Sequence, residues 1–182
     1  MLKRVTIVTA LGVTLWSGAL VSASEPITDA EHKERFCMAE ALFFETGNQP
    51  MIGILGAAEV ILNRVKSERW PNTVCGVVHQ GPINKWWKKR GKIVPVKWKC
   101  QFTYYCDGKS DDIQVVYYKG NMQGKSIGPN MEAWKQSVQV SLLAMYGVTI
   151  DPTSGATHYY NHNISQPSWG QVYPVVLSLI HI

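Results

Sequence analysis

Apolar residues recur at helical spacing in three long stretches of the chain, and each stretch carries its own start and stop signals. In the first stretch, Thr28 and Glu31 form a capping box, which predicts a helix that runs to about Thr46 and stops at Gly47-Asn48. The residues expected to face the core from this helix are Phe36, Ala39, Leu42 and Phe43.

A second helix is predicted to start at Pro50, because proline is favoured in the first helical turn, and to end before Trp70-Pro71. Asn72 or Thr73 then caps a short helix that reaches Val78. The expected core residues of the second helix are Ile54, Ala57, Ala58, Ile61, Leu62 and Val65. Several small residues in this helix would let another element approach closely.

The third long helix is predicted to start near Asn130 and to end at Gly147. Its apolar face consists of Trp134, Val138, Leu142 and Met145. Residues 81–129 lack helical periodicity, and we expect loops there with short strands near 94–96 and 115–118.

A turn signal at residues 151–155 precedes a further expected strand at 157–160. Together these elements predict one α+β domain over residues 24–182, mainly helical with a small β element. The length of 182 residues suits one domain, and 46% apolar against 17% charged residues excludes a disordered chain. The 7 Trp and 8 Tyr residues fit packing first, and also stacking on the apolar faces of sugars.

The first 23 residues have the pattern of a secretory signal peptide. Lys3 and Arg4 form a basic start, a mostly apolar run extends from Val5 to Val21, and small residues precede a cleavage site after Ala23. An uncleaved membrane anchor is the alternative, because a run of about 17 residues reaches the lower limit for crossing a bilayer. The small-residue site favours cleavage and export to the periplasm, cell envelope or extracellular space, without stable membrane insertion afterwards.

Cleavage at this site removes two cations and no acid, so the formal net charge falls from +5 to +3. This modest excess is compatible with attraction to an anionic cell-wall polymer. Nucleic acid is a poorer match as a partner, because Trp and Pro interrupt the basic stretch from Lys85 to Lys99. An exported protein also rarely meets nucleic acid.

The C-terminal residues 175–182 are apolar and stop without a polar end, and residues 177–182 resemble a translated sequencing adapter. We therefore hypothesise that the natural sequence departs from this one at about Leu177. Long-read resequencing tests the hypothesis, because a genuine stop codon directly after Ile182 excludes it.

The chain has 4 cysteines, and an even number in an exported protein is typical of disulfides. Three pairings are possible. Cys100 and Cys106 are close enough in sequence to close a small loop, which leaves Cys37 to pair with Cys75. The longer link closes about 39 residues and contributes slightly more than about 3 kcal/mol in the chain-entropy model.

Ordered motifs run through the chain from Cys37 onwards. After the helix that ends near Glu45 come V-I-L-N-R-V at 60–65, P-N-T-V-C-G-V-V at 71–78, C-Q-F-T-Y-Y-C-D-G at 100–108 and A-T-H-Y-Y-N at 156–161. In order and mutual spacing, over about residues 36–170, they resemble the cell-wall hydrolase family typified by the spore cortex-lytic enzyme SleB. The resemblance implies a lysozyme-like fold and cleavage of glycan strands between N-acetylmuramic acid and N-acetylglucosamine.

The resemblance also implies that Glu45 is the catalytic acid, because it matches the first Glu of the family's E-A-R-G-E motif. The chain departs from that motif at Thr46, Gly47 and Asn48, and Gln49 stands where many members carry a second Glu. The acid itself is retained, while the altered loop bears on how substrate fits.

General chemistry points to Glu45 independently of the resemblance. Glycoside cleavage requires an acid that stays protonated near neutral pH, and this demands a raised pKa. Glu45 follows Phe43 and Phe44 at the negative end of a helix dipole, and both features disfavour its ionisation. An ordinary solvated glutamate at a helix end is the alternative, which the spacing alone favours.

A second carboxylate, which most glycosidases need, is harder to assign. Glu40 lies about 140° round the helix from Glu45, Glu59 is a weak candidate, and Asp107 is expected to support the disulfide loop. A single acid suffices if the muramic 6-hydroxyl attacks its own anomeric carbon and leaves an anhydro sugar. We therefore expect a lytic transglycosylase that uses no cofactor and no metal.

Gln101, Phe102, Thr103 and Tyr104, which lie between the two cysteines expected to be linked, are candidates for substrate binding, because a clamped loop has already lost its ordering entropy. His158 and Tyr159 alternate along the expected strand, where Tyr159 could line the groove, and Trp169 could stack on a sugar. Core packing of Phe102 and backbone hydrogen bonding by Gln101 are equally good alternatives, and packing is slightly favoured for Trp169.

Three other functions compete with glycan cleavage. Cys100, Cys106, His158 and His162 could bind the zinc of an N-acetylmuramoyl-L-alanine amidase, but their spacing is loose and export favours disulfides. A Cys-His peptidase needs a reactive cysteine, and none of the four stands out. A non-catalytic peptidoglycan-binding module is compatible with the altered residues 46–48. The main expectation remains a monomer that acts on peptidoglycan glycan strands.

Overall fold

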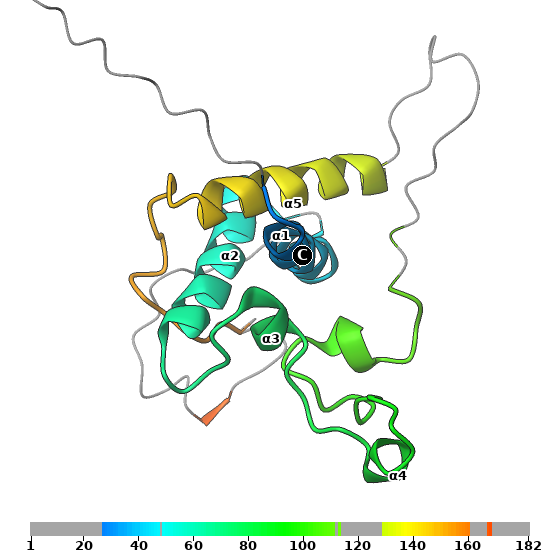
Figure 1. The fold of residues 1–182 in the computed structure, drawn as a ribbon. Coiled ribbons are helices and arrows are strands. Elements are labelled where there is room, and N and C mark those ends of the chain that lie inside the picture. Colours follow the sequence, from blue (N-terminus) through cyan, green and yellow to red (C-terminus); the bar gives the residue numbers. More distant parts are fainter. Residues whose placement is uncertain (1–26, 48, 112, 114–128, 161–166, 169–182) are drawn as a thin grey trace, which may run out of the picture.

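The computed structural model describes residues 27–47, 49–111, 113, 129–160 and 167–168. Within these ranges three long helices pack together: α1 (Asp29–Thr46), α2 (Met51–Lys66) and α5 (Pro129–Met145). Shorter elements lie between α2 and α5 in the sequence: α3 (Val74–Val78), α4 (Lys85–Lys88) and the 3-10 helix η1 (Thr103–Cys106). Figure 1 shows α5 lying across α1 and α2, with α3 on the other side of α1.

Local sequence signals set the ends of α1 as predicted. The Thr28 hydroxyl accepts the N–H of Glu31 at 3.2 Å, and the Glu31 carboxylate accepts the N–H of Thr28 at 2.8 Å. At the other end, the N–H of Gly47 donates to the Phe43 carbonyl at 3.2 Å. The helix therefore ends immediately after Glu45, which lies in its last turn.

The core face of α1 is only partly the predicted one. Ala39 and Leu42 are buried as expected, but Phe36 is 52% exposed and Phe43 is half-buried. Both rings instead meet Trp134 of α5 edge-on, with centroids 5.9 and 6.0 Å away. The core positions of α1 are Cys37, Met38, Ala39, Ala41 and Leu42.

The predicted core face of α5 is partly wrong, because mostly small residues occupy the contact with the other helices and the predicted residues are only half-buried. The buried residues are Ala133, Ser137, Val140, Ser141 and Ala144, and the expected set of Trp134, Val138, Leu142 and Met145 flanks them. Ser137 and Ser141 satisfy their hydroxyls on carbonyls of the same helix, each at 2.8 Å. Small side chains let α5 approach α1 and α2, so the larger ones lie at the edges.

The predictions for α2 and α3 are confirmed with small shifts of boundary. Pro50 precedes α2 as its N-cap, and Thr73 is the residue that caps α3, where its hydroxyl accepts the N–H of Gly76 at 3.0 Å. The expected core face of α2 is buried at Ile54, Ala57, Ala58 and Ile61, with Leu62 and Val65 packed against it.

The expected β element is not formed by the described residues. Their single bridge joins Ile83 to Pro95, and residues 157–160 take no strand. The segment from 81 onwards contains the short helices α4 and η1, which are too short to show a periodicity. The described part of the fold is therefore mainly helical.

Several predicted features lie outside the described residues: the signal peptide at 1–23, the strand at 115–118 and the questioned C-terminus from about 177. Within the described ranges, none of the helices combines the length and the apolar character that crossing a membrane requires.

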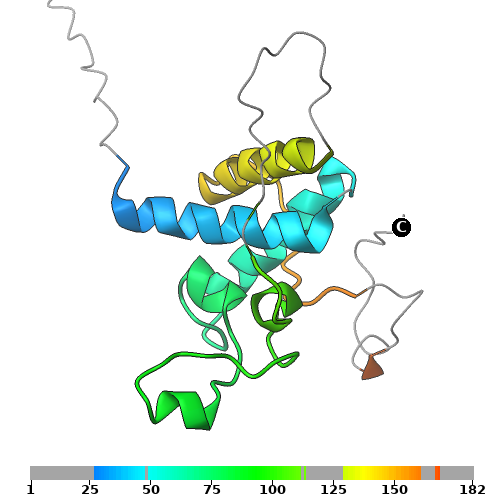
Figure 2. The same cartoon turned by 90° about the vertical axis from the view of Figure 1, so that its right-hand side faces the viewer.

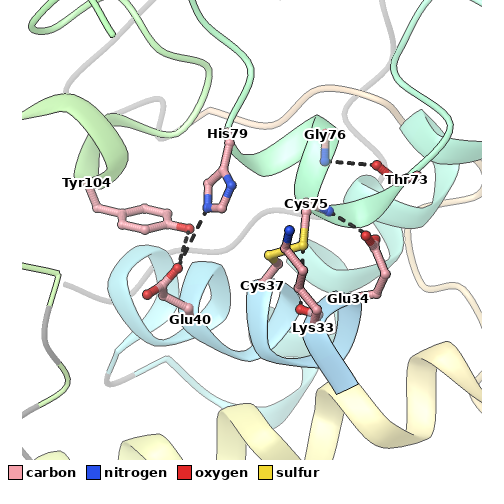
Figure 3. The surroundings of a disulfide bond; sticks show 9 residues. All are labelled: Lys33, Glu34, Cys37, Glu40, Thr73, Cys75, Gly76, His79 and Tyr104. Atoms are coloured by element: carbon pink, nitrogen blue, oxygen red, sulfur yellow. Dashed lines mark hydrogen bonds and ion pairs between the residues drawn. A yellow bond between two sulfur atoms is a disulfide. The ribbon is translucent and has the colours of Figure 1, made fainter. Parts of the chain in front are cut away.

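Two disulfides connect the helical elements. Cys37 of α1 is bonded to Cys75 of α3, as Figure 3 shows, and Cys100 is bonded to Cys106 around η1. These are the pairs that the cysteine spacing favoured, and no cysteine is left free. Beside the Cys37–Cys75 disulfide, the Glu34 carboxylate accepts the N–H of Cys75 at 3.1 Å. The helices α1 and α3 are therefore joined by both a disulfide and a hydrogen bond.

Replacing both Cys37 and Cys75 with Ala should lower the free energy of unfolding by about 3–4 kcal/mol, because the bond removes the closure entropy of a long loop from the unfolded chain. Urea unfolding under non-reducing conditions measures the loss. The matched variant replaces Cys100 and Cys106, which close a much shorter loop, and should lose roughly 2 kcal/mol. An equal loss in both variants would contradict the loop-length argument.

Candidate active site

A cleft of about 310 Å³ lies beside the C-terminal end of α1. Its lining residues come from α1, from η1 and from the segment that follows η1: Phe44, Glu45, Thr103, Tyr104, Asp107, Lys109, Ser110 and Asp111. Folding thus places the predicted acid, Glu45, in one cavity with Thr103 and Tyr104, two residues of the predicted substrate loop.

Glu45 is half-buried in this cleft, and burial raises the pKa of its carboxyl because the anion loses water. The Tyr159 hydroxyl donates to its Oε2 at 3.4 Å. That bond, a hydrogen bond from the Thr103 backbone and the charge of Arg64 all oppose the rise, but burial outweighs them. The side chain is therefore biased towards the protonated form that a general acid needs.

Tyr159 reaches Glu45 from the segment that follows α5, and 42% of its surface stays exposed. Its hydroxyl end lies against the carboxyl, where burial first and then the charge of Glu45 raise the pKa of the phenol. The hydroxyl consequently remains protonated and can donate to either protonation state of the acid.

Arg64 of α2 is a buried cation, 6% exposed, which the sequence analysis did not single out. Its Nε donates to the carbonyl of Thr157 at 2.7 Å, two residues before Tyr159. Its guanidinium carbon lies 4.3 Å from the ring centroid of Trp70 and 5.5 Å from that of Phe102. An arginine within the apolar run V-I-L-N-R-V was the signal available in the sequence.

Asn63, the neighbour of Arg64, anchors the turn that leads to the same segment. Its side-chain amide donates to the Asp151 carboxylate at 3.0 Å and to the Ala156 carbonyl at 3.1 Å. Partial burial disfavours the Asp151 anion, but hydrogen bonds from Thr153 and Asn63 outweigh it and lower the pKa to about 2. The turn is thereby attached to α2.

The cleft contains two carboxylates besides that of Glu45. Asp107 and Asp111 both line it. The Oδ1 atom of Asp107 accepts the N–H of Lys109 at 2.7 Å, and its Oδ2 lies 3.8 Å from the Lys109 ammonium. Asp107 therefore closes a turn after the disulfide, as expected of it, while the sequence analysis did not consider Asp111.

Glu40 and Glu59 contact other parts of the protein and do not line the cleft. Figure 3 shows Glu40 between two rings, with its Oε2 3.5 Å from the Tyr104 hydroxyl and 3.8 Å from Nε2 of His79. Glu59 is 5% exposed and accepts the hydroxyl of Thr149 at 2.6 Å. Glu40 thus supports a residue of the cleft wall, and Glu59 lies inside the domain.

Three more of the predicted substrate residues, Gln101, Phe102 and His158, do not line the cleft. Gln101 is exposed and its N–H donates to the carbonyl of Gln80 at 2.9 Å. Phe102 is 1% exposed and belongs to the hydrophobic core. His158 is exposed beside Trp70, with ring centroids 5.8 Å apart, and Trp169 lies outside the described residues.

The residues that depart from the family motif after Glu45 are also absent from the cleft lining, as far as the structure describes them. Thr46 is buried, and its hydroxyl donates to the Leu42 carbonyl at 2.5 Å, so it completes the last turn of α1. Gly47 and Gln49 follow outside the cleft, and Asn48 lies outside the described residues. Thr46, Gly47 and Gln49 therefore do not contribute to the lining of the cleft around Glu45.

The described residues do not form a cluster of three or more His, Cys, Asp or Glu side chains suited to a metal ion. Two of the cysteines considered as zinc ligands, Cys100 and Cys106, are bonded to each other. His158 pairs its Nδ1 with the Thr157 hydroxyl at 3.0 Å, and His162 lies outside the described residues.

Comparison with known sequences gives a match to the family described as Cell Wall Hydrolase over residues 48–178, which is more than half of the chain and begins just after Glu45. Two curated relatives, both spore cortex-lytic enzymes from Bacillus cereus, are 26% identical over 132 residues. That alignment covers 72% of this chain but only 36% of each relative, so the chain spans little more than a third of their length.

Two solved structures are similar to this one. The catalytic domain of the germination-specific lytic transglycosylase SleB from Bacillus anthracis has 26% identity and a TM-score of 0.48, covering 78% of this chain and 84% of that one. The catalytic domain of the Bacillus cereus SleB protein has 24% identity and a TM-score of 0.45, covering 79% and 81%. On the extent of the family match, this chain belongs to the cell wall hydrolase family.

Proposed function

We propose that the protein cleaves the glycan strands of peptidoglycan between N-acetylmuramic acid and N-acetylglucosamine, with Glu45 as the catalytic acid. The observation that carries the proposal is a carboxyl with a raised pKa, placed in an open cleft and contacted by a hydroxyl donor. Membership of the cell wall hydrolase family and similarity to a protein titled a lytic transglycosylase support this substrate class.

In the proposed reaction, the Glu45 carboxyl gives its proton to the glycosidic oxygen as the bond from that oxygen to the anomeric carbon breaks. The resulting carboxylate then takes the proton of the muramic 6-hydroxyl, whose oxygen attacks the anomeric carbon and closes an anhydro ring. The acid is restored and no water is consumed. The Tyr159 hydroxyl would stabilise the carboxylate between the two steps, because it already donates to Oε2.

The cleft walls suggest which residues hold the sugars. Thr103 and Tyr104 line the cavity, and the Tyr104 ring stacks on Phe44 with centroids 4.9 Å apart, which makes a flat apolar wall beside Glu45. We propose that these residues and Tyr159 contact the sugars next to the scissile bond. Gln101 and His158 would contact substrate only beyond this cleft, and the buried Phe102 would support the loop from within. Trp169 lies outside the described residues and stays a predicted contact.

Hydrolysis is the second candidate outcome, because Asp107 and Asp111 share the cleft with Glu45. A second carboxylate at a suitable distance can activate water against the anomeric carbon and give a reducing muramic end. If reducing ends are found, Asp107→Asn and Asp111→Asn, each made separately, would identify the carboxylate that activates the water.

Glu45→Gln should reduce the turnover of purified peptidoglycan by at least about 10²–10⁴-fold, because the amide cannot transfer a proton. Mass spectrometry of the digest measures the rate and names the product, and anhydromuramic ends are expected from the unmutated protein. Glu40→Gln is the matched control, because Glu40 is on the same helix but outside the cleft, and it should cost far less activity.

Two results would overturn this assignment. One is a folded Glu45→Gln protein with full activity. The other is a digest with intact glycan strands and free stem peptides, which would indicate an amidase. Binding to peptidoglycan without any released product would instead indicate the non-catalytic module.

Tyr159→Phe should move the alkaline limb of the pH profile of kcat/KM to higher pH. The tyrosine hydrogen bond lowers the pKa of Glu45, so its removal raises that pKa further and keeps the acid protonated over a wider range. Tyr146→Phe is the control, because the Tyr146 hydroxyl contacts Arg35 at 2.7 Å rather than the acid. A limb that stays in place, or moves down, would show that Tyr159 does not set the Glu45 pKa.

We also propose that export removes residues 1–23 and that the mature chain, a single catalytic domain, acts as a monomer. The basic start, apolar run and small-residue site support the cleavage. N-terminal sequencing of the exported protein should begin at Ser24, and light scattering should give the mass of one chain. An intact Met1 in the exported protein would favour the membrane-anchor alternative.

A further inference from the structure

Residues 84–99, which we call the cationic arm, project from the helical domain at the end remote from α5, as Figures 1 and 2 show from two sides. The arm contains seven basic residues and no acidic one: Lys85, Lys88, Lys89, Arg90, Lys92, Lys97 and Lys99. All seven are exposed. Because the whole chain has a formal charge of +5, the residues outside the arm sum to −2, so the arm holds the entire positive excess.

Large apolar side chains are exposed on the same arm. Ile93 is 79% exposed, Trp98 is 59% exposed and Trp86 is 52% exposed. Exposing such side chains to water is unfavourable, and exposed apolar groups gathered among cations are typical of a binding surface. None of the seven cations has a carboxylate within ion-pair distance among the residues that the structure describes.

The arm has a defined conformation and is joined to the disulfide loop. The Asn84 N–H donates to the Val94 carbonyl at 2.8 Å, and its side chain caps α4 by accepting the N–H of Trp86 at 3.0 Å. At the base, the N–H of Trp98 donates to the Cys106 carbonyl at 3.0 Å. A partner would therefore meet an arrangement of cations and rings that is already ordered.

The contacts within the arm argue against a sugar as its ligand. The Arg90 guanidinium carbon lies 3.5 Å from the centroid of Trp86, and the Lys92 ammonium lies 5.1 Å from that of Trp87, so cations already cover ring faces that a sugar would need. The arm has no carboxylate for sugar hydroxyls, and its one side-chain amide, that of Asn84, caps α4. These features suit an anionic partner with an apolar interior.

We infer that the cationic arm docks the protein on the surface of an anionic lipid bilayer. Tryptophan rings prefer the depth of the lipid headgroups, and lysine and arginine are attracted to anionic ones, each contributing on the order of 1 kcal/mol or about a fivefold gain in binding. Ile93, an aliphatic side chain without a polar end, would enter the boundary of the acyl chains. This activity goes beyond glycan cleavage and does not depend on it.

Co-sedimentation of the exported protein with vesicles tests the inference. Vesicles of phosphatidylcholine with about 30% phosphatidylglycerol should bind the protein, and vesicles of phosphatidylcholine alone should bind it far more weakly, because counter-charges are absent. The triple variant Lys88→Gln, Lys89→Gln, Arg90→Gln should bind the anionic vesicles on the order of a hundredfold more weakly. The matched triple variant replaces Lys33, Lys66 and Lys135, exposed lysines outside the arm, and should keep most of the binding.

The variant Ile93→Ser distinguishes binding to a bilayer from binding to a soluble polyanion. It should weaken binding to the anionic vesicles by roughly tenfold, because an apolar side chain is lost from the interface, while binding to soluble polyphosphate stays unchanged. Thermal unfolding checks that each variant is folded, and Glu45→Gln should bind vesicles like the unmutated protein. This last control keeps the result independent of whether the protein cleaves glycan.

Equal binding to neutral and anionic vesicles would overturn the inference, as would a triple arm variant that binds like its matched control. If Ile93→Ser leaves vesicle binding unchanged and polyphosphate competes fully, the partner is a soluble polyanion such as an anionic cell-wall polymer, and the bilayer assignment fails.

Discussion

A cation that leaves water for a protein interior is costly unless nearby groups replace its hydration. Arg64 meets this requirement with three partners from different parts of the chain: the Thr157 carbonyl, the Trp70 ring and the Phe102 ring. The helix α2, the disulfide loop and the segment that carries Tyr159 must therefore come together around one guanidinium. Residues 156–160 form neither a strand nor a helix, so the contacts with Arg64 of α2 determine where this segment runs. The position of Tyr159 beside Glu45 follows from those contacts.

The same guanidinium also acts on the proton of Glu45. Its positive charge favours the carboxylate, as do the hydrogen bonds from Tyr159 and Thr103, while burial favours the neutral acid and outweighs them. This balance of opposed effects suits the role that we propose for Glu45, because a group that donates a proton and later recovers it should not be strongly trapped in either protonation state. In the absence of Arg64 and Tyr159, the buried carboxyl would hold its proton more firmly, and the Glu45 carboxylate formed between the two proposed steps would be less stabilised.

The helices with local signals were predictable, and the contacts between them were less so. The capping box of Thr28 and Glu31 and the stop at Gly47 are visible in the sequence because capping uses side chains a few residues apart. The core faces of α1 and α5 were partly wrong because hydrophobic spacing favours large residues, whereas Ser137 and Ser141 are buried by satisfying their hydroxyls within the helix. Glu45 was singled out through its motif and its place at a helix end, and its role as the catalytic acid stays a prediction.

The rest of the site depends on contacts that local patterns do not contain. Arg64 meets Thr157, and Asn63 meets Asp151, across long separations in the sequence, and α4 is a single turn capped by Asn84. The strand expected at 157–160 is an irregular segment because side chains of α2 satisfy two of the carbonyls leading into it, those of Ala156 and Thr157. Alternating residue types predict a strand only where a neighbouring strand supplies those bonds.

Acidic and basic residues are concentrated in different regions of the protein, the cleft and the cationic arm. The cleft is lined by three acidic residues, Glu45, Asp107 and Asp111, and one basic residue, Lys109, while the charged residues of the cationic arm are all basic. An anionic surface attracts the arm and repels a remainder whose formal charge is −4 once residues 1–23 are removed, since the mature chain carries +3 and the arm +7, so the field would orient the protein with its arm towards the surface. Over distances beyond a Debye length of about 8 Å at physiological salt this field is screened, so the orientation is set only at close approach. A peripheral attachment of this kind can release and rebind, because it relies on screened charges and a few shallow apolar contacts rather than on a spanning helix.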